Sequence, residues 1–112
     1  MQIQILENLK KDLLGNINLT YSKSETNRVL IIQALCNNAF TIENISDSQD
    51  TKTLEKLLNA KDSFLDVGNA GTTMRFLTAY FAIKEASKVT LTGSSRMKER
   101  PIHILVDALR KL

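Results

Sequence analysis

The stretch FLDVGNAGTTMR, residues 64–75, does most to decide the predicted fold. Residues 64–67 are typical of a short strand, and the next four form a turn that is bracketed by Gly68 and Gly71. The rest of the stretch opens the longest predicted helix, over residues 72–85. Because a second short strand is predicted over residues 88–92, the stretch belongs to a strand–helix–strand unit, which is typical of α/β folds.

Outward from this unit, the sequence predicts further strands and helices. Strands are expected over residues 2–5, 15–20 and 40–45, the first two because polar and apolar residues alternate. One helix is expected to open at Ser22, because Ser22 and Glu25 form a capping box. Its expected buried face consists of Val29, Ile32, Leu35 and Cys36.

Two more helices complete the prediction. Residues 51–58 are expected to turn Leu54, Leu57 and Leu58 inward, and Pro101 suits the first turn of a helix that runs through Leu112. We therefore predict an α/β (α+β) sandwich. The apolar stripe of the last helix reaches the final residue with no glycine cap, so we expect the chain to be the first part of a longer protein.

Composition narrows the class of protein. The 112 residues suffice for one domain, and 43% hydrophobic with 24% charged residues is usual for a globular protein. No apolar run is long enough for a membrane span and no signal peptide is visible, so we expect no membrane association. The single cysteine, Cys36, excludes an internal disulfide and favours a cytoplasmic location.

The charge distribution favours a small anionic ligand. The formal net charge of +3 lies entirely in residues 93–112, while the first 92 residues are neutral overall. A nucleic-acid-binding protein usually has a broad basic face, so we expect no nucleic-acid partner. No metal or other cofactor is expected either.

Three segments carry the anion-binding signal, and all three are predicted helix starts: residues 22–28, 66–75 and 96–101. Unpaired N–H groups and the helix dipole make such positions suitable for phosphate or carboxylate. The glycine segment is neither a Walker A loop nor a dinucleotide fingerprint, since the required lysine and glycine spacings are missing. Each segment alone has an ordinary structural explanation, but three together favour a binding site.

These motifs resemble the N-terminal part of the 5-enolpyruvylshikimate-3-phosphate synthase family. The resemblance rests on Ser22-Lys23-Ser24 with Asn27-Arg28, on residues 46–50 (SDSQD), on residues 68–75 (GNAGTTMR) and on residues 96–102 (RMKERPI). It implies a fold of βαβαββ repeat units in two lobes. Residues 1–20 would be strands of the other lobe, and residues 21–112 part of a substrate-binding lobe.

The resemblance also implies an activity and site residues. The family transfers the enolpyruvyl group of phosphoenolpyruvate to the 5-hydroxyl of shikimate 3-phosphate and releases phosphate. By matching position, Lys23, Ser24 and Arg28 would bind shikimate 3-phosphate. Lys23, Asn69, Gly71, Thr72 and Arg100 would bind phosphoenolpyruvate. Lys23, Asp50 and Arg100 are the expected catalytic residues, with Arg75 in a supporting role; Asp50 has a simpler explanation as a helix cap.

Some features depart from the family pattern. Thr20-Tyr21 replaces a usual glycine, Glu25 adds a negative charge, and the segment between Leu58 and Asp66 is short. Two alternatives stay open: a relative of the UDP-N-acetylglucosamine enolpyruvyl transferase, against which Ser24, Arg28 and a buried Cys36 argue, and an RNA-binding module with a Gly-x-x-Gly clamp. We expect the complete enzyme to be a monomer, and this chain alone to be inactive and prone to self-association.

Overall fold

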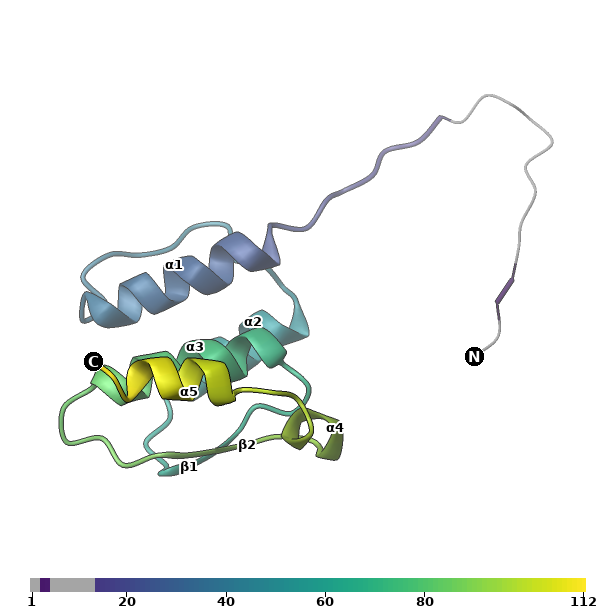
Figure 1. The fold of residues 1–112 in the computed structure, drawn as a ribbon. Coiled ribbons are helices and arrows are strands. Elements are labelled where there is room, and N and C mark those ends of the chain that lie inside the picture. Colours follow the sequence, from purple (N-terminus) through teal and green to yellow (C-terminus); the bar gives the residue numbers. More distant parts are fainter. Residues whose placement is uncertain (1–2, 5–13) are drawn as a thin grey trace.

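The computed structural model describes residues 3–4 and 14–112. The elements in chain order are α1 (Lys23–Leu35), α2 (Gln49–Leu58), β1 (Phe64–Asp66), α3 (Gly71–Ile83), β2 (Thr90–Thr92), α4 (Ser95–Lys98) and α5 (His103–Leu109). Figure 1 shows α1, α2, α3 and α5 on one side of the two strands, with α1 farthest from them and α4 at the end of β2. This mixed arrangement confirms the α/β prediction at the level of fold class.

The strand–helix–strand unit around the glycine turn is confirmed. β1 and β2 pair in parallel, with Leu65 opposite Leu91, and α3 makes the connection between them. Parallel strands require such a crossover. The buried hydrophobic cluster lies between this unit and the helices, and it consists of Leu30, Leu54, Leu57, Leu65, Val67, Leu77 and Met97.

Two glycines bring the turns after β1 and β2 into close contact. Gly68 has a φ of +57°, a backbone conformation that favours glycine. Its carbonyl oxygen accepts a hydrogen bond of 3.0 Å from the Ser94 backbone N–H. A Cβ on Gly93 would lie 2.8 Å from the same oxygen, so a side chain there would push the two turns apart. The carboxyl ends of the two strands therefore meet at one edge.

Serine side chains start both of the first two helices. Ser22 caps α1 as predicted, since its side chain accepts a hydrogen bond from the Glu25 backbone N–H. The predicted helix over 51–58 begins slightly earlier, at Gln49, because Ser48 caps it by accepting from the Thr51 N–H. The explanation of Asp50 as the cap of this helix is thus wrong. The inward face of α2 is confirmed, with Leu54 and Leu57 buried.

Two predicted strands are absent from the structure. Residues 15–20 and 40–45 contain no strand, and Ile17 and Leu19 are 84% and 86% exposed. A strand is stable only beside a partner, and the two-stranded sheet pairs neither segment. Asn44 also has a positive φ, which interrupts an extended backbone. Half of the predicted strand over 2–5, residues 2 and 5, lies outside the described residues, and Ile3 and Gln4 belong to no strand.

The buried face of α1 also differs from the prediction. Thr26, Asn27 and Leu30 are buried, whereas Ile32 and Leu35 are each 51% exposed and Cys36 is exposed. The face is set by packing against α2, which the apolar spacing within α1 does not reveal. A core position for Cys36 is therefore wrong.

The helix predicted from Pro101 to Leu112 is present but shorter, as α5 (His103–Leu109), and the short helix α4 (Ser95–Lys98), which was not predicted, precedes it. Ser94 caps α4, and α5 begins at His103, two residues after Pro101. Leu112, which the prediction placed in this helix, lies after the end of α5 and is 99% exposed. Among the described residues, no helix has both the length and the apolar character needed to cross a membrane.

Candidate functional site

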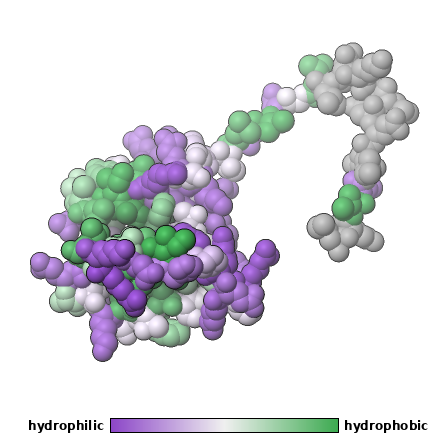
Figure 2. All heavy atoms as spheres, in the orientation of Figure 1, coloured by the Kyte–Doolittle hydropathy of each residue, from purple (hydrophilic) through white to green (hydrophobic). Residues whose placement is uncertain are grey.

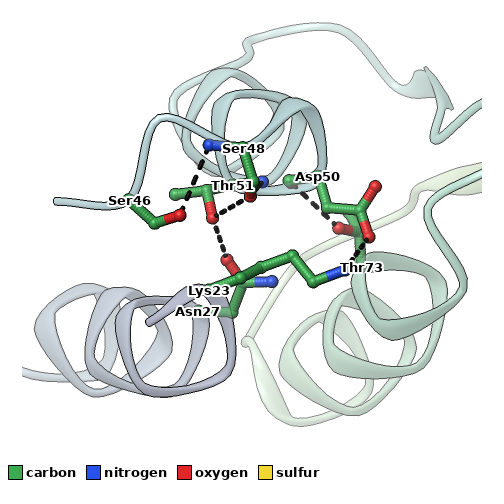
Figure 3. Close-up of polar contacts among 7 residues, drawn as sticks. All are labelled: Lys23, Asn27, Ser46, Ser48, Asp50, Thr51 and Thr73. Carbon is green, nitrogen blue, oxygen red and sulfur yellow. Dashed lines mark hydrogen bonds and ion pairs between the residues drawn. The ribbon is translucent and has the colours of Figure 1, made fainter. Parts of the chain in front are cut away.

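An ion pair joins the first turns of α1 and α2. The Nζ atom of Lys23 lies 3.1 Å from Oδ2 of Asp50, and the two side chains are 49% and 31% exposed (Figure 3). The Asp50 backbone carbonyl also accepts a hydrogen bond of 3.4 Å from the Thr73 hydroxyl of α3. Three helices thus meet at this pair, which leaves a partly exposed ammonium group beside the start of α1.

Ser24 and Arg28 lie together on the exposed side of α1. Nη1 of Arg28 donates a hydrogen bond of 2.9 Å to the backbone carbonyl of Ser24, one turn earlier in the helix. This contact directs the guanidinium toward the helix start, where the Ser24 hydroxyl and the Lys23 ammonium are also exposed. The three polar groups can therefore contact one small anion.

A second cationic place lies at the start of α3. Gly71 is the first residue of the helix, and the Arg100 guanidinium occupies the space where a Cβ of Gly71 would stand. Ala70 provides no side-chain cap, and the first turn of α3 contains no acidic residue. Open N–H groups, the positive end of the helix dipole and a guanidinium thus lie side by side. Such a combination is stabilised by a bound anion.

Arg75 connects the start of α3 with the segment after Arg100 through two hydrogen bonds. Its Nη1 donates to the Gly71 carbonyl at 3.2 Å and its Nη2 to the Pro101 carbonyl at 3.1 Å. One carbonyl belongs to Gly71 itself and the other to Pro101, the residue that follows Arg100. Arg75 therefore lies where it can support Arg100, although its own guanidinium is engaged by the backbone.

Two hollows adjoin the glycine turn and share Asn69. One, of about 560 Å³, lies between α2 and the turn and includes Asp50 in its wall. The other, of about 570 Å³, is lined by Asn69, Arg96, Met97 and Arg100. The Ser94 hydroxyl donates a hydrogen bond of 2.5 Å to Oδ1 of Asn69. Thr72 is exposed on the first turn of α3.

The structure does not bring every predicted residue into one cluster. Within the described part of the chain, no hydrogen bond or ion pair links Lys23, Ser24 or Arg28 to Arg100. The third predicted helix start is also wrong in detail, because Arg96 lies within α4 and Arg100 lies between α4 and α5. The described residues thus form two separate cationic clusters, one at the start of α1 and one at the start of α3, instead of one.

Three residues that the sequence prediction left out of the site belong to its surroundings. Ser94 holds Asn69, Arg96 lines the hollow beside Arg100, and the buried Asn27 connects α1 with α2. A serine three residues before Met97 is a recognisable helix-cap signal for Ser94. The burial of Asn27 has no such local signal, since it depends on the packing of α2.

Comparison with known proteins decides the family. A sequence profile described as EPSP synthase (3-phosphoshikimate 1-carboxyvinyltransferase) matches residues 53–112, more than half of the chain. The chain belongs to the EPSP synthase family. Both Lys23 and Asp50 lie before the matched range, but Gly71, Arg75 and Arg100 lie within it. The glycine turn (residues 68–71) and the segment around Arg100 thus lie in the part that matches the family.

Individual EPSP synthase relatives cover more of the chain. A 3-phosphoshikimate 1-carboxyvinyltransferase of Bacteroides fragilis is 46% identical over 98 residues, which is 88% of this chain and 24% of the relative. Proteins of the same name from Buchnera aphidicola and Actinobacillus pleuropneumoniae are 40% and 39% identical, over 87% of this chain and 28% and 29% of their own length. The chain thus spans about a quarter of these relatives. No solved structure matches the chain significantly.

These comparisons favour neither alternative. The EPSP synthase relatives have a name different from that of the UDP-N-acetylglucosamine enzyme. The argument from a buried Cys36 is lost, because Cys36 is exposed, but Ser24 and Arg28 stay at the start of α1. In the glycine turn, Asn69 and Ala70 offer no positive charge to an RNA backbone.

Proposed function

We propose that this chain supplies part of the substrate-binding site for enolpyruvyl transfer. The reaction moves the enolpyruvyl group of phosphoenolpyruvate to the 5-hydroxyl of shikimate 3-phosphate and releases phosphate. Both substrates are anions with phosphate groups. Their binding therefore needs the kind of cationic helix starts found in α1 and α3. No cofactor or metal takes part in this proposal.

The observation that carries the proposal is the contact of Arg100 with Gly71. A guanidinium beside an uncapped helix start concentrates positive charge that only an anion neutralises. We assign the phosphate of phosphoenolpyruvate to this place, held by Arg100 and the N–H groups after Gly71. Asn69 and Thr72, on the exposed side of the same turn, would contact the rest of the molecule.

The start of α1 would bind shikimate 3-phosphate. Lys23 offers an ammonium, Ser24 a hydroxyl and Arg28 a guanidinium, all three exposed. The Asp50 carboxylate would hold Lys23 at the boundary of the two substrates. Because charge-assisted hydrogen bonds are the strongest available here, these three groups should dominate affinity at this end.

The remaining parts of such an enzyme would complete the site. We infer that segments 15–20 and 40–45, which contain no strand in this structure, become strands of βαβαββ units when neighbouring strands are present, and that residues 1–20 belong to the other lobe. Leu14 and Ile17, which are 100% and 84% exposed, would be buried in that state. The chain alone neither surrounds substrates nor excludes water, so we expect no catalysis from it.

Binding is tested by titrating the ¹⁵N-labelled chain with shikimate 3-phosphate and with inorganic phosphate. Amide signals of residues 23–28 and 69–73 should shift with an affinity on the order of millimolar, which falls as salt is raised. Arg28→Ala and Arg100→Ala should reduce the shifts at their own places. Lys61→Ala is the matched control, because Lys61 is exposed and lies outside both places. Equal shifts near every lysine and arginine would contradict the assignment.

Activity is tested by complementation. The chain is mixed with the part of the Bacteroides fragilis relative that the match leaves uncovered. Phosphate release from phosphoenolpyruvate should require both pieces and shikimate 3-phosphate. The Arg100→Ala chain should fail to restore the reaction, and the Lys61→Ala chain should restore it. Release by the 112-residue chain alone would contradict the expected inactivity.

A further inference from the structure

We propose that the buried hydrogen bond between Asn27 and Thr51 is a positioning device that sets where Lys23 stands relative to Asp50. The inference rests on the proposed function, since it assigns a purpose to the place of Lys23 in an anion-binding site. Asn27 and Thr51 themselves touch no substrate. They act through the two charged residues above them.

The hydrogen bond and the ion pair connect the same two helices in register. Lys23 and Asn27 are four residues apart on α1, and therefore on one face, while Asp50 and Thr51 are adjacent on α2. Oδ1 of Asn27 accepts a hydrogen bond of 2.8 Å from the Thr51 hydroxyl (Figure 3). The exposed Lys23–Asp50 pair thus has a buried connection directly beneath it.

Burial separates the roles of the two connections. Asn27 is 1% exposed and Thr51 0%, whereas the charged pair is partly open to solvent. An exposed ion pair gains little free energy and its long side chains move readily, so it does not fix one helix against another. A hydrogen bond in the low-dielectric interior is stronger and more restrictive.

The Thr51 hydroxyl is oriented from its other side as well. The Ser48 and Thr51 hydroxyl oxygens lie 2.8 Å apart. Because Thr51 gives its only hydroxyl proton to Asn27, the Ser48 hydroxyl donates to Thr51. A second tie lies close by, since the Ser46 backbone N–H donates to the Thr26 hydroxyl at 3.2 Å. The start of α2 is therefore held against α1 by directional polar contacts.

Asn27 lowers the stability of the fold at this position. Its Nδ2 atom is buried and finds no acceptor among the residues that the structure describes. A buried donor without a partner lowers stability, and an apolar side chain of similar volume would avoid that cost. Stability alone therefore does not account for the amide. A requirement for a fixed geometry between Lys23 and Asp50 accounts for the amide at position 27.

The test compares Asn27→Leu/Thr51→Val with the natural chain and with Thr51→Ser. The double variant removes both polar partners together, so its thermal midpoint should stay close to the natural value. The first readout is the NMR signal of the Lys23 ammonium group, recorded with and without Asp50→Asn. Asp50→Asn should shift this signal in the natural chain and in Thr51→Ser, which keeps the hydroxyl. The shift should be largely lost in the double variant.

A shift of undiminished size in the folded double variant would overturn the proposal. The second readout is the titration with inorganic phosphate, in which the double variant should bind about threefold more weakly or worse at residues 23–28. Loss of the ammonium response with unchanged phosphate affinity would overturn the link between this positioning and anion binding. If the natural chain shows no phosphate response at these residues, the proposed function fails there, and the ammonium readout still decides the positioning role.

Discussion

The guanidinium of Arg100 packs against Gly71 so closely that no side chain on Gly71 would fit between them. The Cζ atom of Arg100 lies 2.9 Å from the position that a Cβ of Gly71 would take. The two residues are separated by α3, β2 and α4 in sequence, and the close approach of the two turns brings them together. This contact places a cation at the start of α3, and the first prediction depends on it.

Gly71→Ala should displace Arg100 without unfolding the chain. The new methyl group meets the far end of a flexible, exposed side chain, which can move at a cost below about 1 kcal/mol. Phosphate-induced shifts at residues 69–73 should therefore fall, while the urea midpoint changes little. Gly15→Ala is the control, because a Cβ there has nothing within 4 Å. Unchanged phosphate shifts in Gly71→Ala would show that Arg100 does not contribute to this place.

Loss of the Ser48 cap should destabilise the chain more than loss of the Ser22 cap. Ser48 accepts the Thr51 N–H and also contacts the buried Thr51 hydroxyl, whereas Ser22 accepts one N–H at the exposed start of α1. Ser48→Ala should cost about 1–2 kcal/mol of the free energy of unfolding and Ser22→Ala about 0.5–1 kcal/mol. Urea denaturation measures both. A larger loss from Ser22→Ala would contradict this ranking.

Leu54→Ala should be among the most damaging single changes. Leu54 is 0% exposed at the centre of the buried cluster, and its truncation should cost about 2–5 kcal/mol. Urea denaturation again provides the measurement. The matched control is Leu112→Ala, because Leu112 is 99% exposed and should have almost no effect. Equal effects of the two substitutions would mean that the cluster is not the core.

An apolar groove between α1, α3 and α5 should make the chain self-associate. It has a volume of about 470 Å³, and Ile32, Ile83 and Leu109 lie in its wall. Figure 2 shows hydrophobic side chains gathered on the face where α1 and α5 lie. Exposed apolar patches of this kind favour association. Sedimentation velocity should therefore show a sedimentation coefficient that rises with concentration.

A charged side chain introduced into the wall of the groove should weaken this self-association. Ile32→Glu and Ile83→Glu should each return the chain toward a monomer. Ile104→Glu should not, because Ile104 is 75% exposed but lies outside the groove. A strictly monomeric natural chain at high concentration would contradict the prediction.

Short-range patterns in the sequence determined several parts of the fold. Ser22 as a helix cap, the inward leucines of α2 and the strand–glycine–helix order at residues 64–75 all depend on neighbours a few residues apart. The motifs that carry the resemblance are local for the same reason. The family and the α/β class could therefore be predicted without coordinates.

Tertiary structure alone decided which faces and which distant residues meet. Segments 15–20 and 40–45 have strand-like sequences but no partner strand, and backbone pairing is a property of two segments, not one. Cys36 has core-like spacing but lies outside the contact with α2, while the polar Asn27 lies inside it. The contact of Arg100 with Gly71 likewise exists only because two turns approach each other. The spacing of residues in the sequence indicates whether a segment forms a helix or a strand. Which of its side chains are buried depends on the other elements that pack against it.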